Sequence, residues 1–184
     1  MRLRLRRPVK WPNCAKGGAL PESEPAIAAR GANQRGAARL AAVQALYQMD
    51  VGRVSLPRVV AEFEAFRLGQ EMEGETLRSA DAAFFRLLVA GVVEEQEVID
   101  PLIHATLPPS WPLARLDVTL RSLLRCGVYE LKSRRDVPAR VVISEYLDVA
   151  HAFFEKEEPG LVNAVLDKVA RDVRPDEFGK AGAG

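Results

Sequence analysis

Two arginines and one tyrosine are the side chains of this sequence best suited to bind a ligand. Arg35 and Arg39 lie four residues apart, and Tyr47 follows Arg39 by eight residues, close to two turns of a helix. An arginine can bind phosphate and an exposed aromatic ring can stack on a nucleobase, so the set has the minimum needed to hold single-stranded RNA. The same residues also fit a helix-start arginine beside a tyrosine at the edge of a core, and the spacing leaves both interpretations open.

Side chains with the spacing of an enzyme site are lacking. The two histidines, His104 and His151, have none of the nearby cysteine, histidine or carboxylate positions typical of a metal site. Cys126 stands in an apolar stretch where no neighbour would stabilise a thiolate, so it is predicted to be a core residue. The glycines form no phosphate-binding loop. We therefore expect no enzyme, and neither metal nor cofactor.

Charge is unevenly distributed along the chain. The formal net charge is only +1, but residues 1–34 carry seven Lys/Arg against two Glu, which gives this part +5 and the remainder −4. A basic extension permits contact with nucleic acid without requiring it, and a solvated disordered arm has the same composition.

Cys14 and Cys126 are too far apart in the sequence to suggest a disulfide framework, which favours a reducing, cytoplasmic compartment. No apolar run is long enough to predict a membrane span.

The stretch 117–132 is expected to organise the elements that carry these residues. Its apolar side chains recur at steps of three and four, the period of one helix face turned toward a core: Leu120, Leu123, Leu124, Val128 and Leu131. Asp117 is suited to cap the first turn of this helix. We expect the other helices to pack around it.

The rest of the chain is also predicted to be helical, which makes the fold all-α. Residues 1–33 lack apolar periodicity and are interrupted by proline and glycine, so they are expected to form a disordered extension. Residues 175–184 are expected to be a flexible tail. Gly91 would let another helix approach closely, and Pro101 should kink or break its helix near Val98. The helical periodicity covers 34–51, 56–68, 79 or 81 to 107, 117–132, 138–154 and 161–173, with a short turn near 111–116.

Several motifs, spread over about residues 34–174, together resemble the NusB family of bacterial transcription antitermination proteins. They are Ala38-Arg39 with AVQALY (42–47), FRLLVAGV (85–92), LRCGVYEL (124–131), DVPARVVISEYLDVA (136–150) and LVNAVLDKVA (161–170). The resemblance implies about seven helices in two small packed helical subdomains and a non-enzymatic role. It further implies binding of the boxA element of nascent ribosomal RNA jointly with the ribosomal protein NusE. That complex would join RNA polymerase with other Nus factors and promote read-through.

The resemblance also implies particular binding residues. Arg35, Arg39 and Tyr47 match RNA-contacting positions of the family, and Glu157 stands where an aspartate is common. Gly36 and Ala37 occupy positions where further arginines are usual, so we expect weaker intrinsic RNA affinity or a contribution from the basic extension.

The NusE-like partner is expected to use the face around the central helix. By position, the resemblance implicates Asp117, Leu120, Arg121 and Leu124.

Two alternatives remain open. One is a helical interaction or homodimerisation module with weak or no RNA binding, which the depleted arginines would fit. The other is a helical domain of the kind that precedes the catalytic part of some ribosomal RNA cytosine methyltransferases. The chain ends soon after the last predicted helix, which leaves no room for a cofactor-binding α/β domain.

Overall fold

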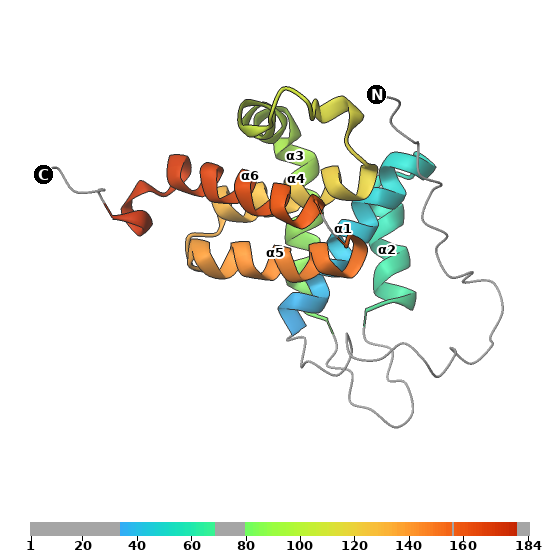
Figure 1. Ribbon diagram of the computed structural model, residues 1–184. Coiled ribbons are helices and arrows are strands. Elements are labelled where there is room, and N and C mark those ends of the chain that lie inside the picture. Colours follow the sequence, from blue (N-terminus) through green and yellow to red (C-terminus); the bar gives the residue numbers. More distant parts are fainter. Residues whose placement is uncertain (1–33, 69–79, 156, 180–184) are drawn as a thin grey trace, which may run out of the picture.

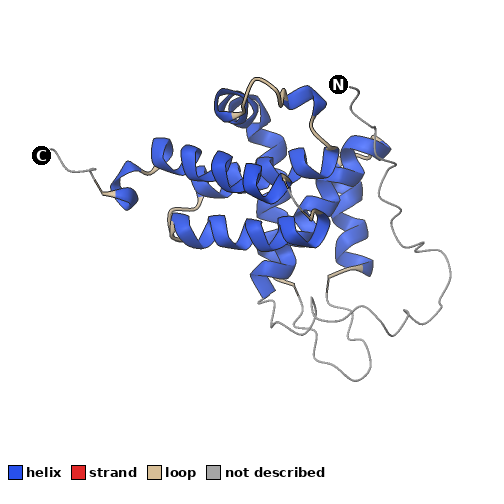
Figure 2. Cartoon of the chain, viewed as in Figure 1, coloured by secondary structure: helices blue, strands red, loops and turns tan. Residues whose placement is uncertain are grey.

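A computed structural model describes residues 34–68, 80–155 and 157–179, and every regular element in this part of the chain is helical (Figures 1 and 2). The prediction of an all-α fold is therefore confirmed. Six α-helices and two short 3-10 helices follow one another: α1 (Gln34–Gly52), α2 (Leu56–Phe66), α3 (Ala82–Thr106), η1 (Leu113–Arg115), α4 (Val118–Ser133), α5 (Ala139–Phe153), α6 (Glu158–Val173) and η2 (Pro175–Phe178).

The helix starts have clear local causes. Asp117 caps α4 as predicted, since its carboxylate accepts hydrogen bonds from the backbone N–H groups of Thr119 (2.8 Å) and Leu120 (3.3 Å). The last helix, α6, begins three residues earlier than the periodicity indicated, at Glu158. Pro159 falls in its first turn, where the fixed φ of proline suits a helix and no N–H is needed.

The helices pack as two groups that share the central helix. Helices α1, α2 and α3 contact one another, and α4, α5 and α6 form a second set. Helix α4 packs against α1, α3, α5 and α6, and most of its residues are buried. Figure 1 shows α5 and α6 side by side, running across the direction of α1, α2 and α3. The two predicted subdomains and the organising role of 117–132 are thus confirmed.

Gly91 allows the close approach of α3 and α4 that the sequence suggested. A Cβ atom on Gly91 would lie 2.0 Å from Cζ of Tyr129, so the tyrosine ring occupies the space of the missing side chain. No larger residue fits there without moving the ring.

Pro101 does not break its helix. Helix α3 continues past it to Thr106, although proline cannot donate the backbone hydrogen bond that would reach back toward Glu97. Glu97 is exposed, so water can serve that carbonyl. In Figure 1 the last turns of α3 are seen nearly end-on while the earlier turns run vertically, so the helix changes direction along its length.

The chain after α6 is folded onto the body, which corrects the prediction that a flexible tail starts at 175. Residues Pro175–Phe178 form η2, and the Glu177 carboxylate accepts a hydrogen bond (2.6 Å) from the N–H of Ala139 at the start of α5. That bond is the main cause that lowers the pKa of Glu177. Residues 1–33 and 180–184, which carry the predicted extension and the end of the tail, lie outside the described residues. None of the described helices is long and apolar enough to cross a membrane.

Candidate nucleic-acid interface

Arg39 lies at the centre of a buried charged cluster that joins three helices. Its Nε and Nη2 donate to the two carboxylate oxygens of Glu130 on α4, at 3.0 and 2.6 Å. Its Nη1 donates to Glu145 on α5 at 2.8 Å. The hydroxyl of Tyr146 donates to Glu130 at 3.1 Å. All the charged partners of this guanidinium are therefore inside the protein or at its edge.

This placement argues against the prediction that Arg39 contacts RNA. Its side chain is only 2 % exposed, and a phosphate would have to displace two carboxylates to reach the guanidinium. The spacing of apolar residues in the sequence already indicated that Arg39 is buried. Arg39 precedes Val43 and Leu46 by four and seven residues, which places it on the same buried face of α1.

Arg35, by contrast, is available at the surface. Its side chain is 49 % exposed, and its Nε lies 3.9 Å from Asp81, the cap of α3. The guanidinium carbons of Arg35 and Arg134 lie 5.5 and 5.3 Å from the centre of the Phe84 ring. The start of α1 and the end of α4 thus present two surface cations around one aromatic ring.

Tyr47 and Glu157 occupy different parts of the surface. Tyr47 is half-buried near the end of α1, where it interacts with other residues of the chain. Glu157 is exposed and is the N-cap residue of α6, although its side chain makes no capping hydrogen bond. Helix α1 packs against α5, the helix that leads into the turn carrying Glu157 (Figure 1). Arg35 and Tyr47 therefore lie on α1, and Glu157 follows a helix that packs against α1.

The residues predicted to bind a protein partner are split by the structure. Leu120 and Leu124 are 1 % and 0 % exposed and belong to the core, so their prediction as partner contacts was wrong: the apolar stripe faces inward. Asp117 is exposed. Arg121 is half-buried, and its Nη2 donates to Asp50 at the end of α1, at 2.7 Å. Of the four residues, only Asp117 and Arg121 remain on the surface.

Two charged residues important to the architecture were missed by the sequence analysis. Glu130 is fully buried. The sequence indicated this burial, because Glu130 is a carboxylate among the apolar residues of the central helix. Arg174 is also fully buried and donates to backbone carbonyl oxygens near the end of α4. Arg174 follows the buried residues Leu166 and Ala170 by eight and four positions, so the sequence indicated its burial. Its partners could not be predicted, because four of its five acceptors are main-chain oxygens.

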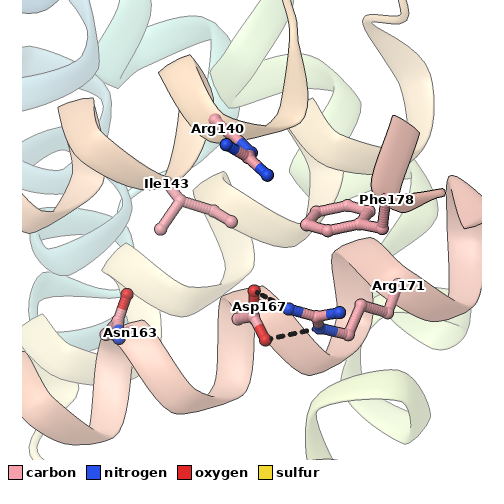
Figure 3. Close-up of a pocket in the computed structure, with 6 residues that line it drawn as sticks. All are labelled: Arg140, Ile143, Asn163, Asp167, Arg171 and Phe178. Atoms are coloured by element: carbon pink, nitrogen blue, oxygen red, sulfur yellow. Dashed lines mark hydrogen bonds and ion pairs between the residues drawn. The ribbon is translucent and has the colours of Figure 1, made fainter. Parts of the chain in front are cut away.

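A shallow hollow of about 270 Å³ lies elsewhere, between α5, α6 and η2 (Figure 3). Figure 3 shows Arg140 and Phe178 above it and an ion pair between Asp167 and Arg171 along its lower edge. These residues lie toward the start of α5 and the end of α6, whereas Glu157 lies at the opposite end of that helix pair.

No group of three or more His, Cys, Asp or Glu that could hold a metal ion occurs among the described residues. Burial raises the pKa of the Cys126 thiol, which fits a core residue.

Comparison with known proteins gives a consistent result. The model of the NusB family matches residues 36–171. The transcription antitermination protein NusB of Rhodopseudomonas palustris (strain TIE-1) is 62% identical over 151 residues, which cover 82% of this chain and 87% of the relative. The protein of the same name from Mesorhizobium japonicum is 60% identical over 151 residues, or 82% of this chain and 97% of the relative.

Solved structures show the same fold. The NusB structure of T. maritima matches with a TM-score of 0.65 and 29% identity, over 78% of this chain and 96% of the other. A crystal structure of the antitermination factors NusB and NusE in complex with dsRNA matches with a TM-score of 0.61 and 26% identity. That match covers 76% of this chain and 97% of the other.

Proposed function

The chain belongs to the NusB family, and on this premise we propose that it binds the boxA element of nascent ribosomal RNA together with the ribosomal protein NusE. It is a transcription antitermination factor, and membership of this family confirms the expectation that it is not an enzyme. In the proposed role it joins RNA polymerase with other Nus factors in the cytoplasm and promotes read-through.

The observation that supports RNA binding is the difference in exposure between the two arginines of α1. Arg35 is half exposed at the start of the helix, whereas Arg39 is enclosed by carboxylates. Arg35 is therefore the cation of this pair that can bind a phosphate. Tyr47 and Glu157 complete the proposed RNA surface from the end of α1 and the start of α6. A structural relative crystallised with NusE and dsRNA supports RNA and NusE as classes of ligand.

The protein partner is proposed to contact the surface near the start of α4. Asp117 is exposed there, and Arg121 forms an ion pair with Asp50 that bridges α4 and α1. The core leucines of α4 stay outside this surface. The division of the chain into an N-terminal extension, a NusB-like body and a short C-terminal end also remains a proposal, with the body now extended through Phe178.

Fluorescence anisotropy with a labelled boxA-type single-stranded RNA tests the function. We expect binding that tightens when NusE is added and weakens as salt rises, because phosphate contacts release counterions. Arg35→Ala should weaken binding and reduce the slope of log K against log salt by about 0.7, the value for one phosphate contact on a single strand. Arg58→Ala on α2 is the matched control, since Arg58 is also an exposed arginine, on a helix outside the proposed surface.

Two outcomes would count against the proposal. Absence of binding both with and without NusE would favour a helical interaction or homodimerisation module, which sedimentation of the free protein would then reveal. Equal effects of Arg35→Ala and Arg58→Ala would show that the contact with RNA is a general attraction to positive charge.

A further inference from the structure

Arg39 connects the helix that carries the proposed RNA residues to the rest of the protein. We propose that Arg39 is a positioning residue: it holds α1 against α4 and α5 so that the RNA groups of α1 and of the α5–α6 turn face one strand. This inference rests on the proposed function for its RNA part, whereas the alignment of the helices can be tested without RNA.

The geometry of the cluster makes Arg39 a joint between three helices. Two of its nitrogen atoms donate hydrogen bonds to the two carboxylate oxygens of Glu130 on α4, and the third donates to Glu145 on α5. Three donors in one plane constrain the direction of the side chain in a way that a single ammonium group cannot. The Phe84 ring of α3, 5.2 Å from the guanidinium carbon, lies against the same group. A helix attached in this way resists rotation about its own axis.

The charges of the cluster support a permanent attachment. Burial alone would lower the pKa of Arg39, but the hydrogen bond and the negative charge of Glu130 raise it above its ordinary value. The guanidinium thus remains charged, and its removal would leave the fully buried Glu130 carboxylate with the Tyr146 hydroxyl as its one hydrogen-bond donor among the described residues. An uncompensated charge in that place is costly, so the pair is difficult to separate.

The position of Arg39 along α1 connects this attachment to RNA binding. Arg35 lies about 6 Å before it and Tyr47 about 12 Å after it along the helix axis, at roughly 1.5 Å per residue. Glu145 lies on α5, the helix that runs into the turn carrying Glu157. A shift of α1 at Arg39 would therefore move Arg35 and Tyr47 relative to Glu157, although Arg39 itself touches no RNA.

The experiment measures the alignment of α1 and α5 directly. Spin labels are placed at Val51→Cys in α1 and Ala152→Cys in α5, both exposed positions, in a chain with Cys14→Ser. Cys126 is fully buried and can stay. Electron–electron double resonance then gives the distribution of distances between the two labels. It is measured for Arg39→Lys and for Glu145→Gln, which keeps the shape of the half-buried side chain and removes only its negative charge. Arg58→Lys is the control.

We expect a narrow distribution in the unsubstituted chain and the control, and a shifted or broadened one in Arg39→Lys and Glu145→Gln. In unlabelled proteins, well below the melting temperature, both variants should bind RNA roughly 3- to 30-fold more weakly, the range of a typical coupling energy. The salt slope should stay unchanged, because no phosphate contact is lost.

Two results would overturn the inference. An unchanged distance distribution in both variants would show that Arg39 does not set the alignment. A salt slope reduced by about 0.7 in Arg39→Gln, which removes the charge that Arg39→Lys keeps, would show a direct phosphate contact. If the unsubstituted protein binds no RNA, the proposed function fails, and the distance distributions still decide whether Arg39 positions α1.

Discussion

Arg174 offers the strongest test of how the end of the chain holds the second group of helices together. Its guanidinium donates to four backbone carbonyl oxygens and to Glu177. The acceptors are Leu131 (2.5 Å), Val137 (2.6 Å), Arg134 (2.8 Å), Glu177 (2.9 Å) and Glu130 (3.0 Å). Carbonyl groups at the end of a helix lack partners within it and carry partial negative charge, so a buried cation suits this place. The informative substitution is Arg174→Met, which keeps a long side chain and removes every donor.

The expected loss of stability follows from the acceptors that would remain. Backbone N–H groups already bond to the carbonyls of Glu130 and Arg134. Within the described part of the chain, Arg174 is the only donor to the carbonyl oxygens of Leu131 and Val137. A buried acceptor left without a partner costs about 1–3 kcal/mol, and the charged bonds to the other groups are also lost, so we expect a total near 4 kcal/mol. For a chain of this size that corresponds to a melting temperature lower by roughly 10–15 °C.

Thermal unfolding followed by circular dichroism, together with urea denaturation, measures this change. Arg171→Met, in the last turn of α6, is the control, because Arg171 is exposed and within the described residues pairs with Asp167 one turn away and with the Phe178 ring. An exposed pair of this kind is screened by solvent and contributes little to stability. Equal changes for the two variants would refute the reasoning, since they would mean that the buried hydrogen bonds of Arg174 contribute no more than a surface ion pair.

Three further predictions concern single contacts. Gly91→Ala should destabilise the fold by roughly 1–2 kcal/mol in urea denaturation, because the new methyl group displaces the Tyr129 ring. The better helix propensity of alanine offsets only part of that cost. A variant more stable than the unsubstituted protein would contradict the close approach of α3 and α4. Asp117→Ala should cost about 1 kcal/mol through the lost cap of α4, and Asp117→Asn much less, by the same assay. The hydrogen bond from Arg134 holds the pKa of the Asp136 carboxyl at about 2, so the stability this group adds should be complete above pH ~4, and it should be lost as the pH falls from there through about 2. An NMR titration of Asp136 with an ordinary midpoint would contradict the last prediction.

The helices and their internal causes could be predicted because they depend on neighbours in the sequence. Apolar side chains three and four residues apart share a face of a helix wherever it packs, so the central helix was found with its boundaries within one residue. The cap at Asp117 and the close approach at Gly91 also depend on short-range geometry, and the structure confirms both. The early start of α6 was missed because no apolar period covers Glu158, Pro159 and Gly160 and because proline and glycine are typical of turns, whereas proline is also favourable in a first helical turn.

The partners of individual charged residues could not be predicted in this way, because they are far away in the sequence. Arg39 and Glu130 are 91 residues apart, so nothing near Arg39 indicates that a carboxylate will enclose it. A family resemblance carries a residue type to a position but leaves its exposure open. Leu120 and Leu124 show the opposite error: their apolar period already predicted burial, and the resemblance was followed in its place. Where the two conflict, the periodicity of an apolar residue is the better guide to whether a partner can reach it.

Glu130 explains how the central helix can organise both groups of helices. Its carboxylate is bound by Arg39 of α1, and its backbone carbonyl is bound by Arg174 at the end of α6. The helix that carries Arg35 and Tyr47 and the helix that begins next to Glu157 are thus both attached at the last turns of α4. The planar donors of the two arginines fix the direction of these attachments as well as their distance. The proposed RNA surface therefore depends on a residue that lies inside the protein. A substitution at Glu130 should loosen α1, whereas the bond from Arg174 to the Glu130 backbone carbonyl remains.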